Sequence, residues 1–170
     1  MSLLQIRLAC YSFFVTQPFL YSVEREYPVS VDRLWRAWTV AAELEDWYHP
    51  TDLRAVKGAT ASELIVGGLW SCGVDVPAHN FAAYFFGQYT KIVQNELLEH
   101  TMHYTESFEE FAAKDFTSPS HLVVLEFQAR EEGAWVKFSQ FGELPEGQEK
   151  QAQEGMTSYL ESLASFLSAN

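Results

Sequence analysis

The chain has 170 residues, of which 48% are hydrophobic and 15% aromatic. This length and composition predict one independently folding domain with a sizeable core, and they exclude a disordered chain. Eleven basic residues against 23 acidic ones give a formal net charge of -12, and the basic residues form no cluster that could track phosphates. We therefore expect no nucleic-acid partner and no anionic membrane surface as partner. A neutral or cationic ligand is easier to accept than an anionic one.

Cysteine usage and the N-terminus bear on the cell compartment. Cys10 and Cys72 lie far apart in the sequence without metal-ligand spacing, so they predict neither a disulfide framework nor a zinc site. The letters "LAC" at 8–10 resemble a lipoprotein cleavage box, but no basic segment precedes them, and Gln5 and Arg7 interrupt the apolar stretch. No apolar run approaches the roughly 18 residues that a membrane-spanning helix needs. We expect a soluble cytoplasmic protein with free thiols, no metal and no cofactor.

Two strands are predicted before the first helix. Residues 4–10 alternate apolar and polar side chains, which is the period-2 pattern of a half-buried strand. After Pro18, "FLYSVEREY" (19–27) is rich in aromatic and β-branched residues and is followed by a proline. We therefore divide the chain into an N-terminal extension, 1–18, that adds an edge strand, and a single domain, 19–170.

A short amphipathic helix is predicted after Ser30. Serine is a favoured N-cap residue, and Asp32 in the first turn complements the helix dipole. Apolar side chains then follow at the i, i+3, i+4, i+7 spacing of one helix face; they are Val31, Leu34, Trp35 and Trp38. We interpret Trp35 and Trp38 as core anchors.

A second short helix is predicted for "AAELEDW" (41–47). It ends before Pro50, because the residue that precedes a proline avoids the α region. Trp47 therefore lies at the boundary of helix and loop, where a side chain is able to face a cavity. We expect Trp47 and Tyr48 to line the mouth of such a cavity.

Residues 51–142 carry the pattern of an antiparallel sheet. Gly67 and Gly68 are interpreted as a bulge or kink that lets the sheet curve. The stretch 106–116 interrupts the strands, and its phenylalanines predict a long, partly helical loop that could close an opening. Turn residues separate six short β-prone runs, which are 52–58, 63–76, 80–93, 97–105, 121–131 and 134–142.

The longest helix is predicted at the C-terminus, after Pro145. The order of elements is then a strand, two short helices, about six strands and a long terminal helix. Apolar side chains share one face of this last helix; they are Met156, Tyr159, Leu160, Leu163, Phe166 and Leu167.

This order of elements resembles the helix-grip fold of the START-related (SRPBCC) superfamily, and specifically its branch homologous to the activator of heat-shock protein 90 ATPase. The resemblance covers roughly residues 19–168. Met156 stands where that family usually has a tryptophan, and the 105–119 insertion is longer than usual. The motifs that carry the resemblance are "REYPVSVDRLWRAWT" (25–39), "LEDWYHP" (44–50), "GGLW" (67–70), "GQYTKI" (87–92), "HLVVLEF" (121–127), "EGAWVKFSQFG" (132–142) and "GMTSYLESL" (155–163).

The resemblance implies an α+β helix-grip fold. A curved antiparallel sheet of six to seven strands would wrap round the long C-terminal helix, with two short helices after the first core strand. The arrangement would leave an internal apolar cavity, which is the usual form of a small-molecule site. If the family register holds, alternate strand residues point into it. The expected cavity residues are Trp47, Tyr48, His49, Trp70, Tyr89, Val123, Leu125, Phe127, Val136, Phe138, Gln140, Met156 and Tyr159.

No motif in the sequence supports metal binding or nucleophilic catalysis. His100 and His103 are three apart in a predicted strand, so they point to opposite faces and do not share a metal ion. No serine sits in a Gly-x-Ser-x-Gly turn, and neither cysteine has a base at a recognisable spacing. The stretch "VGGLW" lacks the spacing and the following helix of a phosphate-binding loop. We expect no catalytic residue and no metal ligand.

Three functions are compatible with these observations. The first is a protein that holds a small apolar or aromatic ligand in the cavity and catalyses nothing. The second is a protein-interaction or co-chaperone-like module, which would show an exposed apolar patch and a filled core. The third is a cyclase- or hydrolase-like enzyme, which would need a buried ionisable group near the cavity, with His49, His79 and Glu126 as candidates. A homodimer paired through the N-terminal strand stays open as an alternative to a monomer.

Overall fold

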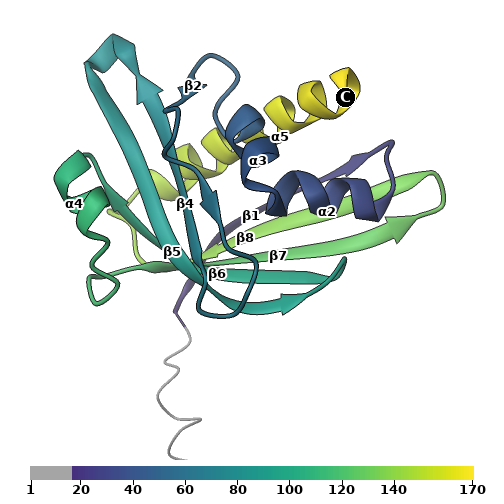
Figure 1. The fold of residues 1–170 in the computed structure, drawn as a ribbon, viewed down its shortest axis with the longest axis horizontal. Coiled ribbons are helices and arrows are strands. Elements are labelled where there is room, and N and C mark those ends of the chain that lie inside the picture. The colour runs from purple at the N-terminus through teal and green to yellow at the C-terminus, as the bar shows by residue number, and fades with distance from the viewer. Residues whose placement is uncertain (1–16) are drawn as a thin grey trace, which may run out of the picture.

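A computed structural model of the protein describes residues 17–170. In it, one antiparallel sheet curls around a long C-terminal helix, and two short helices pack beside that helix (Figure 1). The expected edge strand at 4–10, the dimer contact through it and Cys10 lie outside the described residues. Among the described residues Cys72 is a buried free thiol.

The strands and helices follow the order expected from the sequence. The strands are β1 Phe19–Tyr27, β2 Arg54–Ala55, β3 Ala61–Ser62, β4 Leu69–Val76, β5 Phe81–Val93, β6 Leu97–Thr105, β7 His121–Arg130 and β8 Gly133–Phe141. The helices are α2 Val31–Thr39, α3 Ala41–Trp47, α4 Phe108–Ala113 and α5 Gln148–Ala169, with a 3-10 turn, η1, at Pro77–His79.

The sheet runs in the order β1-β8-β7-β6-β5-β4-β2, and β3 also pairs with β4. All neighbours are antiparallel, and β1 lies beside β8, from Phe19 opposite Phe141 to Tyr27 opposite Ala134. The α+β helix-grip class is therefore confirmed. The strand count differs from the expectation, because the run 52–58 forms only the two-residue β2, and the two-residue β3 was not expected.

Helix α2 begins as the sequence predicts. The Ser30 hydroxyl accepts a hydrogen bond from the Arg33 backbone N–H at 3.1 Å, which satisfies one of the free donors of the first turn. Trp35 and Trp38 are buried in the main core, and Trp35 meets the Phe127 ring edge-on at 5.1 Å. Trp35 therefore anchors α2 to the sheet, and Trp38, which meets Trp47 edge-on at 4.6 Å, anchors it to α3.

The Gly67–Gly68 pair forms a bulge where a tight turn leads into β4, as the sequence predicts. The Gly67 N–H donates to the Tyr89 carbonyl at 2.7 Å and the Tyr89 N–H donates to the Gly68 carbonyl at 3.0 Å, so two residues lie opposite one. Gly67 has φ of +85°, a conformation that L side chains rarely adopt. The Gly68 N–H donates to the Ile65 carbonyl at 2.8 Å, and a Cβ on Gly68 would lie 2.0 Å from the Glu63 carbonyl oxygen. The tight turn and the bulge that follows it together explain both glycines.

Helix α4 builds a second, smaller core. Phe111 stacks on Tyr84 at 4.7 Å, and Phe86 packs beside them. Phe85, the residue between these two in β5, packs against the main core, so α4 covers the opposite face of the sheet. Residues 106–116 line neither of the two pockets on the concave face, so their predicted role in closing an opening stays a prediction.

Candidate functional site

Two adjoining pockets lie between the concave face of the sheet and α5. The inner pocket has a volume of about 250 Å³, and the outer pocket, of about 820 Å³, opens beyond it. Phe85, Met102, Gln140 and Leu144 line both, so the two pockets are continuous. The walls of the inner pocket carry no charged side chain; they are Tyr21, Tyr48, Phe85, Met102, Phe138, Gln140, Leu144, Ala152, Gly155, Met156 and Tyr159.

Small residues on α5 leave the space that becomes the inner pocket. Ala152, Gly155, Met156 and Tyr159 follow at the i, i+3, i+4, i+7 spacing of one helix face, and all four line it. A Cβ added to Gly155 would meet no atom within 4 Å. The helix therefore stands clear of the sheet at this point, and a larger side chain there would enter the pocket.

Three tyrosines form a large part of the wall of the inner pocket. The rings of Tyr48 and Tyr159 meet edge-on at 4.8 Å, and Tyr21 stacks on Phe138 at 6.1 Å. Burial raises the pKa of Tyr48 and of Tyr159 well above the ordinary value, and it raises the pKa of Tyr21 in the same direction. All three phenols are therefore neutral at physiological pH.

A chain of hydrogen bonds leads from the inner pocket to the outer one. The Tyr21 hydroxyl donates to Gln140 Oε1 at 2.6 Å, and Gln140 Nε2 lies 2.7 Å from His121 Nδ1. The Glu143 carbonyl can only accept, so His121 Nε2, 2.9 Å away, carries the proton. Nδ1 then accepts from Gln140, which fixes the orientation of that amide at the junction of the two pockets.

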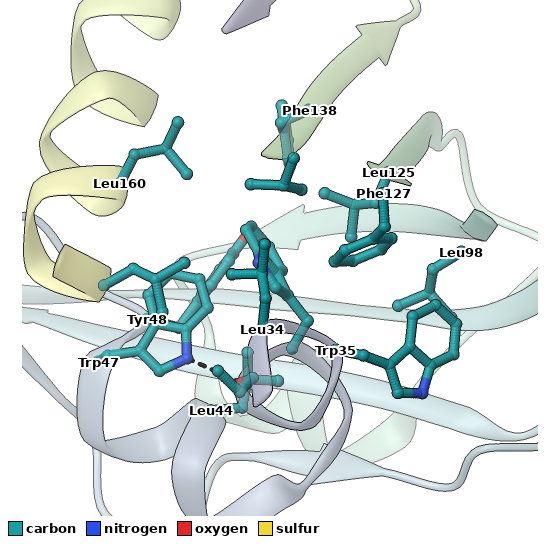
Figure 2. Close-up of a cluster of buried hydrophobic side chains, with 14 of the residues drawn as sticks. Leu34, Trp35, Leu44, Trp47, Tyr48, Leu98, Leu125, Phe127, Phe138 and Leu160 are labelled. Carbon is teal, nitrogen blue, oxygen red and sulfur yellow. Dashed lines mark hydrogen bonds between the residues drawn. The ribbon is translucent and has the colours of Figure 1, made fainter. Parts of the chain in front are cut away.

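Five of the expected cavity residues line the inner pocket, namely Tyr48, Phe138, Gln140, Met156 and Tyr159. The other strand positions that were expected to point inward are buried, but they lie in the filled part of the core that Figure 2 shows. They are Tyr89, Val123, Leu125, Phe127 and Val136. The concave side of the sheet is therefore packed along most of its length and open at one end.

Trp47 belongs to the core and does not line the inner pocket. Its side chain is 1% exposed, meets Trp38 edge-on at 4.6 Å and donates a hydrogen bond from Nε1 to the Ala37 carbonyl at 2.8 Å (Figure 2). Tyr48 lines the inner pocket and does not line the outer one.

Two further expected residues lie away from the inner pocket. Trp70 is buried and stacks on the His100 ring at 4.0 Å. His49 lines a shallow hollow near the end of α5, and its ring nitrogens lie 2.7 Å from the Pro50 carbonyl and 3.3 Å from the Asp46 carbonyl. Neither residue lines the inner pocket.

Six lining residues were not anticipated from the sequence: Tyr21, Phe85, Met102, Leu144, Ala152 and Gly155. Tyr21 sits opposite Gln140 in the β1–β8 pair, so the two share a face of the sheet. The sequence alone does not show this pairing, so Tyr21 can be placed in the pocket only once β8 is known to be the partner of β1. The small residues of α5 did carry a signal, since Ala152 and Gly155 continue the apolar face upstream of Met156.

The paired histidines behave as their spacing predicts. His100 packs against Trp70 in the main core, whereas His103 stacks on Phe86 at 4.8 Å in the second core, on the opposite face. His103 Nδ1 lies 2.8 Å from the Ser118 hydroxyl. Within residues 17–170, no three His, Cys, Asp or Glu side chains gather closely enough to hold a metal ion.

The curled antiparallel sheet, the long helix across it and the pocket between them define an α+β protein of the helix-grip class. The family model of the activator of Hsp90 ATPase homolog 1-like proteins matches residues 28–168, and the chain belongs to that family, within the START-related superfamily. A comparison with curated protein sequences gives no match. Of the helices in the described part of the chain, none is long and apolar enough to cross a membrane.

Solved structures support the same fold at low sequence identity. A protein of Arthrobacter aurescens superposes with a TM-score of 0.71 at 24% identity, over 88% of this chain and 86% of the other. One of Chromobacterium violaceum gives 0.70 at 18% identity, over 85% and 94%. DynU16, from the dynemicin biosynthetic locus, gives 0.63 at 16% identity, over 86% of this chain and 46% of its own length. These identities establish a likeness of fold.

Proposed function

We propose that this protein binds a small apolar or aromatic molecule in the inner pocket and catalyses no reaction on it. The observation that carries the proposal is the inner pocket itself, about 250 Å³ of space with uncharged, largely aromatic walls. Ligand sites in proteins are concave, mostly apolar and largely pre-formed, with a few placed polar groups. Tyr48, Gln140 and Tyr159 supply such groups here. The proposal places the protein in the cytoplasm, with neither nucleic acid nor membrane as a partner.

Filling the pocket from α5 tests this proposal. We expect Gly155→Phe to place a ring in the inner pocket, because nothing lies within 4 Å of the added Cβ. The probe is 2-isopropenylnaphthalene, an uncharged bicyclic hydrocarbon, and its dissociation constant is measured by ligand-observed NMR. Binding to the wild-type protein and its loss in Gly155→Phe are expected.

The matched control is Gly155→Ala, which changes the same residue without filling the pocket. We expect it to bind the probe as the wild type does and to raise the free energy of unfolding by about 1 kcal/mol, because glycine is a poor residue inside a helix. Circular dichroism checks that Gly155→Phe is folded. A folded Gly155→Phe protein that binds the probe as tightly as the wild type would rule out the inner pocket as the site.

A second candidate function is a protein-interaction module of the kind that the family name implies. An apolar turn between β3 and β4 favours it, since Ile65 and Val66 are each 67% exposed beside the half-exposed Leu64. The test is the ATPase rate of a heat-shock protein 90 with and without this protein. A stimulation that the double variant Ile65→Ser, Val66→Ser lowers would favour this function, and no stimulation would remove it.

The proposal assigns no catalytic residue. The candidates for an enzyme were His49, His79 and Glu126, and none of them lines the inner or the outer pocket. His79 and Glu126 are exposed to solvent on the described surface.

A further inference from the structure

Two tyrosine hydroxyls at the inner pocket have no partner among residues 17–170. Tyr21, Tyr27 and Tyr89 are buried, and their hydroxyls bond Gln140, the Leu160 carbonyl and Ser62, respectively. Tyr48 is 5% exposed, yet neither its hydroxyl nor that of Tyr159 hydrogen-bonds a described residue. Neither hydroxyl oxygen is among the fully buried atoms that lack a partner, so both are accessible from the pocket and available to a molecule in it.

The polar groups of the inner pocket are mostly donors. The hydroxyls of Tyr48 and Tyr159 each have a proton to give, and Gln140 Nε2 uses one proton on His121 and keeps a second. Among the described residues, the lining side chains therefore offer several free protons and no carboxylate, and the side-chain carbonyl oxygen of Gln140 already accepts from Tyr21. A ligand that accepts hydrogen bonds therefore pairs best with the free donors of the inner pocket.

The tyrosines stay neutral in this environment. Burial disfavours the phenolate, and the raised pKa values of Tyr48 and Tyr159 keep the protons on both oxygens. No lysine, arginine or histidine from residues 17–170 lines the inner pocket, so this lining offers a buried carboxylate no counter-charge. The complementary ligand is therefore uncharged.

We propose that the ligand is a neutral aromatic or apolar molecule with an accepting oxygen, such as a ketone, and that Tyr48 and Tyr159 donate to that oxygen. The inference rests on the proposed function and names the ligand class for the same pocket. A carbonyl oxygen has two lone pairs, which matches two phenol donors whose rings are in edge contact at 4.8 Å. Gln140 then helps to orient the polar end of the ligand.

A pair of probes that differ in one atom group tests the inference. In 2-acetylnaphthalene the side chain carries C=O, and in 2-isopropenylnaphthalene it carries C=CH₂ in nearly the same shape. We expect the wild-type protein to bind the ketone about tenfold more tightly than the alkene, the effect of roughly 1.4 kcal/mol of hydrogen bonding. The double variant Tyr48→Phe, Tyr159→Phe is expected to lose this preference while it binds the alkene as the wild type does.

The control variant is Tyr104→Phe, which removes a phenol from the outer pocket, where its hydroxyl donates to Glu106 at 2.7 Å. It is expected to keep the tenfold preference. Unchanged alkene binding by the double variant shows that its pocket is intact.

The two possible failures are distinguishable. Equal binding of ketone and alkene by the wild-type protein would overturn the ligand class and leave the pocket as a binding site. A tenfold preference that survives in the double variant would overturn the role of the two tyrosines. If neither probe binds the wild-type protein, the proposed function and this inference fall together.

Discussion

At the scale of single residues, His100 is a base buried without a counter-charge. Its ring is 1% exposed, stacks on Trp70 at 4.0 Å and lies with Nδ1 2.8 Å from the Thr101 carbonyl, to which it donates. Burial lowers its pKa to about 4, against an ordinary value near 6.5. The folded protein therefore holds this imidazole neutral at a pH where the unfolded chain protonates it.

Acidification should destabilise the protein through His100. Below a pH of about 6.5 the unfolded state binds a proton that the folded state refuses, so the free energy of unfolding falls until the pH reaches about 4. At about 1.4 kcal/mol for each pH unit, the loss attributable to His100 is roughly 3 kcal/mol. Urea unfolding across this range measures it.

Variants separate His100 from the carboxylates, which also titrate in acid. His100→Phe keeps an aromatic ring against Trp70 and should flatten the pH dependence relative to the wild type. His79→Gln, which removes an exposed histidine, should keep it. A wild-type slope that His100→Phe leaves unchanged would contradict the assignment.

The side of the sheet to which a side chain points was predictable for strand residues, because successive side chains in a strand point to opposite faces. Phe138 and Gln140 alternate along β8, and this alternation, combined with the register of the family that the sequence resembles, predicted both on the concave side. Trp47 could not be placed in the same way, because its direction depends on a contact with another helix. A residue at a helix end can face a cavity or its neighbour with the same sequence around it, and only the packed structure decides.

At the scale of elements, Trp47 joins α2 to α3. The carbonyls of the last turn of a helix have no partner within that helix, and Trp47 Nε1 satisfies the one at Ala37. Glu43 in α3 adds ion pairs with Arg33 at 2.6 Å and Arg36 at 3.3 Å. The two short helices therefore behave as one packed unit against the sheet.

We expect Trp47→Phe to loosen this unit and to leave the ligand site intact. The change removes the donor from a buried carbonyl, which should lower the free energy of unfolding by about 1–3 kcal/mol. Because Trp47 does not line the inner pocket, the dissociation constant of 2-isopropenylnaphthalene should not change. Chemical denaturation and ligand-observed NMR measure the two quantities.

Trp135→Phe is the matched control, since Trp135 is half-buried and its ring lies under the Arg130 guanidinium at 5.2 Å. It should destabilise the protein less than Trp47→Phe does. Weaker probe binding in a folded Trp47→Phe protein would show that this indole contributes to the site after all.

Elements with a strong local pattern were predicted to the residue. The bounds of β1 and β6 agree with the runs 19–27 and 97–105, because both are β-prone runs next to turn signals, Pro28 after β1 and residues 94–96 before β6. β2 forms over only two residues of the predicted run 52–58, and β3 was not predicted, because each exists through its pairing with β4. The role of α4 escaped for a related reason, since which face of the sheet Phe111 covers depends on tertiary packing.

At the scale of the whole molecule, the net charge of the protein and the lining of the inner pocket both disfavour anionic ligands. The net charge of -12 repels anions from the surface, and the inner pocket offers an anion no cationic partner. Glu143 stands at the outer pocket and adds to the effect. Anionic ligands are therefore disfavoured both when they approach the protein surface and when they enter the inner pocket.

We expect 2-naphthamide to bind at least about tenfold more tightly than 2-naphthoate, because burying the carboxylate costs desolvation energy that nothing in the pocket returns. Ligand-observed NMR at low and high salt checks this. Salt screens the surface charge but not the buried site, so most of the difference should persist at high salt. Equal affinities at low salt would contradict the expected selection.

The pairing of β1 with β8 has a consequence for how the protein is made. A ribosome delivers β1 first, yet its partner is the last strand of the sheet, and the helix wall of the pocket follows later still. Until α5 emerges, the apolar concave face has no cover and is open to chaperones and to aggregation. A ligand of the inner pocket can therefore bind and stabilise only a finished chain, and it cannot assist the protein during synthesis.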